Sequence, residues 1–129
     1  MKTLSLIILI TLITSCRNPG SPVNYPYVPV HRATDDLQVY DGKYRPQIFS
    51  NGLVISCTIV NKSNSINYKD VKLIVKYYSV TRTVMASYNY VIYQYLNAGK
   101  LIKVNLKGPK TDLKSLRTIS VDVADATQY

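Results

Sequence analysis

The strongest constraint on the fold is an alternation of apolar and more polar side chains that recurs along the chain. Between residues 53 and 60, apolar side chains occupy every second position, at Leu53, Ile55, Cys57 and Ile59. Successive side chains of a β-strand point to opposite faces, so this spacing predicts a strand with one buried face. The same pattern returns in segments 71–78, 102–107 and 119–124. No segment keeps helical periodicity over three turns, and we therefore expect an all-β fold.

Turn-forming residues separate these segments at short intervals. The breaks are Asp41-Gly42 and the segments 61–67, 79–83, 97–100 and 108–115. They leave strands expected at 37–40, 49–60, 71–78, 83–96, 102–107 and 119–124. Short, evenly spaced strands are typical of a sandwich or barrel. We expect an immunoglobulin-like antiparallel β-sandwich of six or seven strands over residues 37–129. The Cys-Trp-Cys signature of antibody domains is missing, because the chain has no Trp.

Three neighbouring stretches resemble a known domain. They are Val60-Asn61-Lys62-Ser63, Asn67-Tyr68-Lys69-Asp70-Val71-Lys72-Leu73 and Tyr77-Tyr78-Ser79. A strand ends in Asn, a loop follows, and an alternating strand then ends in an aromatic pair. Roughly residues 50–107 are similar in this way to the FxLYD-type domain of bacterial exported proteins, although Val75-Lys76-Tyr77-Tyr78-Ser79 lacks the Phe and Asp of that motif. The resemblance implies a β-sandwich and brings no activity with it.

The first sixteen residues have the layout of an export signal. Lys2 precedes an almost wholly apolar run from Leu4 to Ile13, and Thr14-Ser15 lead into Cys16. The run is too short for a stable membrane-spanning helix. The segment resembles a bacterial lipoprotein signal peptide, which implies cleavage after residue 15 and lipid attachment at Cys16. The alternative is an ordinary cleavage site beside a free cysteine.

The lipoprotein resemblance also implies a location. Two or more acyl chains on Cys16 would hold the protein stably on a membrane of the cell envelope. Arg17 stands where Asp acts as an inner-membrane retention signal in some bacteria, and this favours the outer membrane. The expected organisation is a signal peptide over 1–15, the lipidated Cys16 with a tether to residue 36, and the β-domain over 37–129.

Prolines define the tether. Pro19, Pro22, Pro26 and Pro29 recur every three or four residues, which favours an extended, polyproline-like chain. We interpret this segment as a spacer that holds the domain away from the membrane. Two alternatives are a proline-rich ligand, because Pro26 to Pro29 has PxxP spacing, and a strip that docks along the edge of the domain.

A strong positive charge indicates the partners to expect. The chain carries 16 Lys and Arg against 7 acidic residues, all Asp, for a net charge of +9. Lys100, Lys103, Lys107 and Lys110 follow one another with few acids nearby. Such a field favours anionic lipid headgroups, acidic glycans or nucleic acid. An envelope protein is a further candidate partner. The alternative is a solvated basic face. We expect no nucleic-acid partner, because no nucleic-acid-binding motif is visible.

Tyrosine is unusually frequent, with twelve residues against one Phe. Tyr88 and Tyr90 share one face of their expected strand, and Tyr93 and Tyr95 share the other. This change of face predicts either a bulge near Val91 or Ile92 or a strand that is buried on both faces. We expect these four tyrosines, with the four lysines above, to form any contact surface. The alternative is that tyrosine simply favours strands and the rim of the core.

The sequence offers little catalytic chemistry. The one histidine, His31, lies in the expected tether, and Cys57 lies inside a strand pattern, where an unpaired cysteine usually behaves as a small buried hydrophobe. Asp35, Asp36 and Asp41-Gly42 are a faint calcium-like cluster, which we interpret as turn-forming residues. We therefore expect no catalytic residue, metal or cofactor. The expected function is a non-enzymatic binding or assembly module of the cell envelope. The alternatives are a small envelope enzyme or enzyme inhibitor, and a purely structural spacer.

Overall fold

The structure is a computed structural model that describes residues 31–47, 52–110 and 114–129. Predictions for the signal peptide, Cys16 and the tether prolines lie outside the described residues. Within the described part, no helix is long and apolar enough to cross a membrane.

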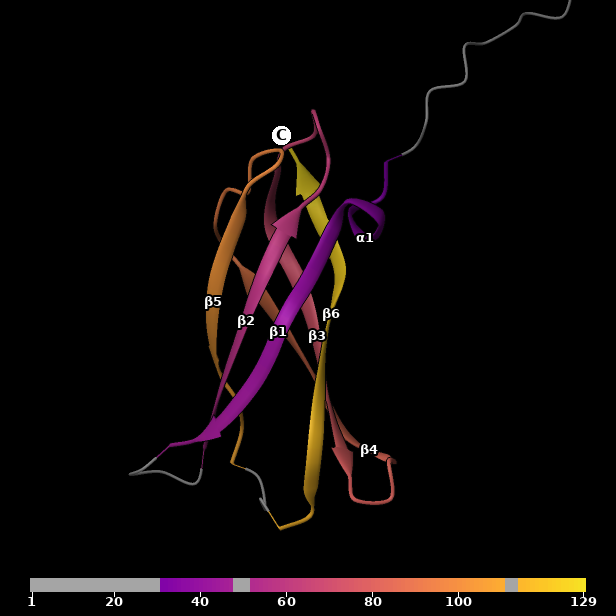
Figure 1. Cartoon of the computed structure of the whole chain (residues 1–129), viewed down its shortest axis with the longest axis vertical. Helices are drawn as coiled ribbons and strands as arrows, with labels where there is room; N and C mark the ends of the chain where they lie inside the picture. Colours follow the sequence, from indigo (N-terminus) through magenta and orange to yellow (C-terminus); the bar gives the residue numbers. More distant parts are fainter. Residues whose placement is uncertain (1–30, 48–51, 111–113) are drawn as a thin grey trace, which may run out of the picture.

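Two antiparallel three-stranded sheets pack face to face (Figure 1). One contains β1 (Leu37–Pro46), β2 (Leu53–Asn61) and β5 (Leu101–Lys107), in the order β1-β2-β5. The other contains β3 (Tyr68–Ser79), β4 (Val84–Ile92) and β6 (Leu116–Gln128), in the order β4-β3-β6. The predicted all-β antiparallel sandwich is confirmed, with six strands among the described residues.

The strand order follows the immunoglobulin pattern. In that fold, strands A, B and E share one sheet, and C, F and, in variable-type domains, C′ share the other. Here β1, β2 and β5 correspond to A, B and E, while β3, β4 and β6 correspond to C, C′ and F. The chain therefore crosses between the sheets after β2, β4 and β5. Both sheets consequently contain strands that are far apart in the sequence.

The core lies between the two sheets and uses the alternation seen in the sequence. The buried side of β2 carries Leu53, Ile55, Cys57 and Ile59, and that of β3 carries Val71, Leu73, Val75 and Tyr77. Cys57 is a free, buried thiol, and its burial raises its pKa because the thiolate would lose solvation. β2 and β3 are the central strands of their sheets, so they supply the best-shielded part of the core.

The predicted turn at Asp41-Gly42 is wrong. β1 continues through it to Pro46, and the pairing with β2 shifts between Tyr40 and Lys43. Asp41 has a φ of 55°, a left-handed conformation that Asp tolerates better than most residues. The two residues therefore form a bulge within a strand, and not a turn that ends it.

The expected strand over 83–96 is too long, and its predicted bulge is in the wrong place. β4 ends at Ile92, and the register irregularity lies at its other end, opposite the step from Tyr77 to Tyr78. Other expected bounds were too short: β3 begins at Tyr68, and β6 spans Leu116–Gln128.

A short helix, α1 (Ala33–Asp36), precedes β1 and packs beside β6 at one end of the sandwich (Figure 1). Ala33 is buried there. This segment falls within the expected tether, yet it is joined to the folded domain. Three further segments meet at the end of the sandwich where α1 lies: the loops 61–68 and 92–101 and the end of β6. They are joined there because Tyr68 pairs with both Leu96 and Gln128.

Candidate anion-binding surface

The outer face of the β1-β2-β5 sheet gathers basic side chains on both sides of a central polar strand. Antiparallel pairing places residues of the three strands in rows across the sheet. Read from β1 through β2 to β5, the rows are Arg45–Val54–Lys107, Lys43–Ser56–Asn105 and Tyr40–Thr58–Lys103. Their side chains point away from the core, since Ile55 and Cys57 between them are buried.

We call the exposed residues Lys43, Arg45, Lys103 and Lys107 the basic face. Neighbouring strands lie ~4.8 Å apart, so the charges of β1 and β5 flank β2 at a backbone separation of about 10 Å. Lys62 lies beyond the end of β2, with its ammonium 5.4 Å from the ring centre of Tyr40. Positive charge thus extends along the sheet and past its end at Asn61, where β2 ends.

A shallow depression of about 240 Å³ lies within this face. Lys43 and Lys103 line it from the two outer strands, and Ser56, Thr58 and Asn105 supply polar groups. The Ser56 hydroxyl donates to Oδ1 of Asn105 at 2.7 Å. Asp41 also contributes to its lining. Ammonium groups on both sides of hydroxyl groups suit a phosphate or another small anion.

Among the described residues, no ion pair joins the basic face to an acidic side chain, although Asp41 lies at the edge of the depression. The ion pairs in the described part of the chain join Lys72 to Asp125 at 3.2 Å and His31 to Asp36 at 3.5 Å. Both lie elsewhere in the fold. The outer face of the other sheet carries both signs of charge, because Asp122 and Asp125 of β6 accompany Lys72 and Lys76 of β3. The positive field is therefore concentrated on one side of the sandwich.

The four lysines expected to form a contact surface occupy different places. Lys103 and Lys107 belong to the basic face. Lys100 lies in the turn before β5, where its carbonyl accepts a hydrogen bond from the Asn61 N–H at 2.9 Å. Lys110 lies beyond the end of β5 and is exposed.

The four tyrosines divide between a strand and a loop. Tyr88 and Tyr90 share the inner side of β4, opposite Val75 and Leu73. The Tyr90 hydroxyl donates to the Lys107 carbonyl at 3.1 Å and so connects the edges of the two sheets. Tyr93 and Tyr95 follow β4 and are 81% and 68% exposed. Tyr95 also packs edge-on against Tyr129, with 4.9 Å between ring centres.

Sequence reasoning missed Lys43 and Arg45. A signal was present, because these basic residues alternate with the half-buried Tyr44. It was hidden when Asp41-Gly42 was interpreted as the end of the strand. Once the strand continues, Lys43 and Arg45 fall on the same face as Lys103 and Lys107.

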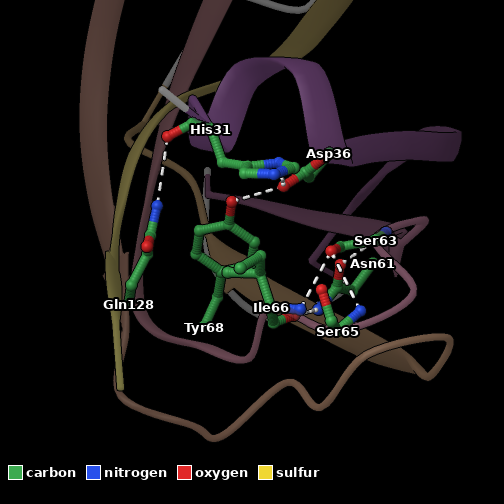
Figure 2. A network of polar contacts seen from close by, with 8 residues as sticks. All are labelled: His31, Asp36, Asn61, Ser63, Ser65, Ile66, Tyr68 and Gln128. Carbon is green, nitrogen blue, oxygen red and sulfur yellow. Dashed lines mark hydrogen bonds and ion pairs between the residues drawn. The ribbon is translucent and has the colours of Figure 1, made fainter. Parts of the chain in front are cut away.

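A second polar cluster fastens α1 to the end of the sandwich, as Figure 2 shows. The Tyr68 hydroxyl donates to Oδ2 of Asp36 at 2.6 Å, and Nδ1 of His31 lies 3.5 Å from the same oxygen. Nε2 of Gln128 donates to the His31 carbonyl at 3.1 Å. Contacts from β3 and β6 thus hold both ends of the segment 31–36.

Asn61 organises the adjoining loop (Figure 2). It is fully buried, and its Nδ2 donates to the carbonyls of Ile66 and Leu96 at 2.8 and 3.1 Å. Its Oδ1 accepts from the Ser63 N–H at 3.0 Å, and the Ser63 hydroxyl accepts from the Ile66 N–H at 2.9 Å. These bonds satisfy backbone groups where two crossing loops meet.

The chemistry of this second cluster is structural. Burial, followed by the hydrogen bond and negative charge of Asp36, raises the pKa of Tyr68 well above its usual range. The hydroxyl keeps its proton at neutral pH, as an ordinary tyrosine does, and acts as a donor, and the raised pKa extends this state to more alkaline pH. Within residues 31–47, 52–110 and 114–129, no group of three or more His, Cys, Asp or Glu side chains could hold a metal ion.

Comparisons with known proteins give one structural similarity. No model of a known protein family and no curated protein sequence matches the chain. The crystal structure of a DUF1425 family member from Shewanella sp. pv-4 is similar to 70% of this chain and 79% of its own, with 12% sequence identity and a TM-score of 0.47. The similarity to the FxLYD-type domain remains a resemblance of sequence.

Proposed function

We propose that this protein is a lipid-anchored, non-enzymatic binding module of the cell envelope, and that its basic face binds anionic lipid headgroups. The observation that carries the proposal is the concentration of Lys and Arg on the outer face of one sheet, where none of them forms an ion pair with a described acidic residue. The face is an extended sheet surface with a shallow depression, which suits the flat array of phosphates at a membrane better than a single small ligand.

The proposed anchor supports the same partner. Lipid on Cys16 would keep the domain within reach of a membrane, so that each weak contact of the basic face acts at high effective concentration. A basic side chain near an anionic membrane contributes ~1 kcal/mol, and the contribution falls off within a Debye length. Four such residues would orient the tethered domain with its β1-β2-β5 sheet toward the headgroups.

The anchor is tested first by fractionation. The substitution Cys16→Ser should move the protein from the membrane fraction into the soluble fraction at high salt, where the basic face contributes least. Parent protein should stay with the membrane at the same salt concentration. Equal retention of parent and variant would overturn the lipid anchor.

The basic face is tested separately from the anchor. The processed chain 16–129 with Cys16→Ser is mixed with vesicles of phosphatidylglycerol or of phosphatidylcholine, and circular dichroism checks that it is folded. Binding should require the anionic lipid and weaken with salt. Lys43→Gln with Lys103→Gln should reduce it roughly 30-fold at low salt, at ~1 kcal/mol per lysine.

A charge-matched control uses the other sheet. Lys72→Gln with Lys76→Gln removes the same formal charge from its outer face and should change binding far less. Equal losses in the two double variants would mean that only net charge matters. That outcome, or tight binding to phosphatidylcholine, would overturn the assignment to the basic face.

A further inference from the structure

Strand β4 forms one edge of its sheet and differs from the other edge strands of the described structure. None of its nine residues, Val84–Ile92, is charged. The edge strands β1, β5 and β6 all carry Lys, Arg or Asp side chains. Charged residues on an edge prevent another strand from pairing there, and Pro has the same effect. β4 lacks both, in a chain with a net charge of +9.

The same edge exposes apolar surface to water. Val84, Met85, Tyr88 and Val91 are all more than a third exposed. A second strand hydrogen-bonded to β4 would pair its free backbone groups and cover part of this surface.

The regular part of β4 is complementary to itself. The strand pairs with β3 without interruption from Ala86 to Ile92, and the irregularity at Met85 ends this straight segment. Its midpoint is Asn89. In an antiparallel pair of copies centred there, Tyr88 lies opposite Tyr90 on the inner side, and Ser87 opposite Val91 on the outer side. Each Asn89 lies opposite its own copy, so no charge opposes a charge anywhere in the pairing.

We propose that two copies of this chain pair through β4, centred on Asn89, to form a continuous six-stranded sheet. A second copy is the fitting partner because the pairing requires an uncharged strand with aromatic residues at matching positions, and β4 itself has both properties. Cross-strand aromatic pairs stabilise antiparallel sheets, and paired asparagine amides can hydrogen-bond to each other.

The symmetry of this dimer has a consequence for the basic face. Antiparallel pairing within one sheet places the two-fold axis perpendicular to that sheet, so both copies present the same side in the same direction. The two basic faces, on the partner sheets, then point the same way. The dimer doubles the positive charge directed at one surface. The pairing itself depends only on β4 and stands independently of the proposed function.

Disulfide trapping tests the pairing in the full-length protein within the cells that produce it, wherever in the cell it lies. Residues opposite each other in an antiparallel pair have Cα atoms ~4.5–5.5 Å apart, within the range that a disulfide spans. Asn89→Cys should therefore form a disulfide-linked dimer on mild oxidation. Ser87→Cys alone should form little disulfide-linked dimer, because Ser87 does not lie opposite its own copy. A mixture of Ser87→Cys and Val91→Cys chains should form a disulfide-linked heterodimer, because these two positions lie opposite each other. Parent protein and Thr118→Cys, on the exposed edge strand β6, control for other cysteines and for random collision.

A charge test follows on purified protein in detergent. Asn89→Lys places two lysines directly opposite each other and should convert a dimer into a monomer in analytical ultracentrifugation. Thr118→Lys adds the same charge on β6 and should leave the dimer intact. A parent protein that is monomeric at all concentrations overturns the proposal. The proposal is also overturned if Asn89→Cys crosslinks no better than Thr118→Cys. Efficient crosslinking by Ser87→Cys alone would overturn the proposed register.

Discussion

The hydroxyl of Tyr68, at the start of β3, donates a 2.6 Å hydrogen bond to Oδ2 of Asp36, the last residue of α1. The Tyr68 side chain is completely buried, and Asp36 is largely covered, so water cannot easily replace either partner. This bond joins α1, which precedes β1, to the central strand β3 of the second sheet.

Tyr68→Phe should therefore destabilise the protein. A hydrogen bond to a charged group contributes about 1.5–3 kcal/mol, and the substitution leaves the Asp36 carboxylate partly buried with one donor fewer. Urea unfolding monitored by circular dichroism would measure the change in the free energy of unfolding. A midpoint equal to that of the parent would show that water or His31 fully replaces the bond.

Tyr77 is buried like Tyr68, but its hydroxyl lacks the hydrogen bond that the Tyr68 hydroxyl makes. Its hydroxyl is buried and has no hydrogen-bond partner among the described residues; the nearby Tyr90 hydroxyl donates to the Lys107 carbonyl instead. Tyr77→Phe should accordingly be neutral or stabilising by up to about 1 kcal/mol, because it removes a buried polar atom without unpairing another. Clear destabilisation in the same urea experiment would contradict this expectation.

Gly108 and Tyr77 should be energetically coupled. A Cβ at position 108 would lie 2.9 Å from the Tyr77 hydroxyl and 3.0 Å from Cβ of Leu53. Gly108→Ala should destabilise by about 1–3 kcal/mol through overpacking. Adding Tyr77→Phe should recover part of this loss, and a double-mutant cycle would measure the coupling. Strict additivity would show that contact with Leu53 alone determines the cost.

Stability should fall at alkaline pH because of the same two tyrosines. Burial is the main cause that raises the pKa of Tyr68 and Tyr77 in the folded state above the unfolded value near 10. Above that pH the unfolded chain releases protons that the folded chain keeps, so the free energy of unfolding decreases. Each tyrosine contributes a slope of ~1.4 kcal/mol per pH unit.

The double variant Tyr68→Phe with Tyr77→Phe isolates this contribution. Its stability should depend less steeply on pH above about 10 than that of the parent, although lysine titration will remain in both. Urea midpoints at a series of pH values would provide the comparison. Parallel curves would mean that neither tyrosine controls the alkaline loss.

The local parts of the fold could be predicted from the sequence. Alternation predicted β2 and β3 because both are central strands with one side in the core, where burial and spacing agree. The errors lie where local and tertiary preferences differ. Asp41-Gly42 has turn chemistry but forms a bulge inside β1, and Tyr93 to Tyr95 have strand propensity but lie in an exposed loop.

The candidate site was harder to predict for a different reason. Lys43 and Lys103 are sixty residues apart in the sequence, and only pairing of both outer strands with β2 brings them to one depression. Local patterns carry no information about which strands become neighbours in a sandwich. The sequence did indicate the excess of positive charge and the lysines of β5, but not the strand that completes the face.

Asn61 should be intolerant of a change that keeps its shape. Its two amide donors reach the Ile66 and Leu96 carbonyls in a fully buried site. Asn61→Asp preserves the volume but replaces the donors by an acceptor that faces two carbonyl oxygens. The expected loss in the free energy of unfolding is about 2–4 kcal/mol at neutral pH. A change in side-chain volume cannot explain such a loss, because Asp and Asn have nearly the same volume. Thermal and urea unfolding would measure it, and a loss below that of Ser65→Ala, at a neighbouring exposed position, would contradict the role of these bonds.

If both proposals hold, Asn89→Lys should have two opposite effects on binding to anionic vesicles, one through net charge and one through loss of the β4 dimer. Asn89→Lys adds a positive charge, so charge alone would strengthen binding to anionic vesicles. If binding depends on two basic faces that point the same way, loss of the dimer should weaken it despite the added charge, by tenfold or more through lost avidity. Thr118→Lys adds the same charge without touching β4 and should bind as well as the parent or better. Vesicle sedimentation with the three processed chains compares them directly. Stronger binding by Asn89→Lys, in a sample shown to be monomeric, would mean that each basic face acts alone.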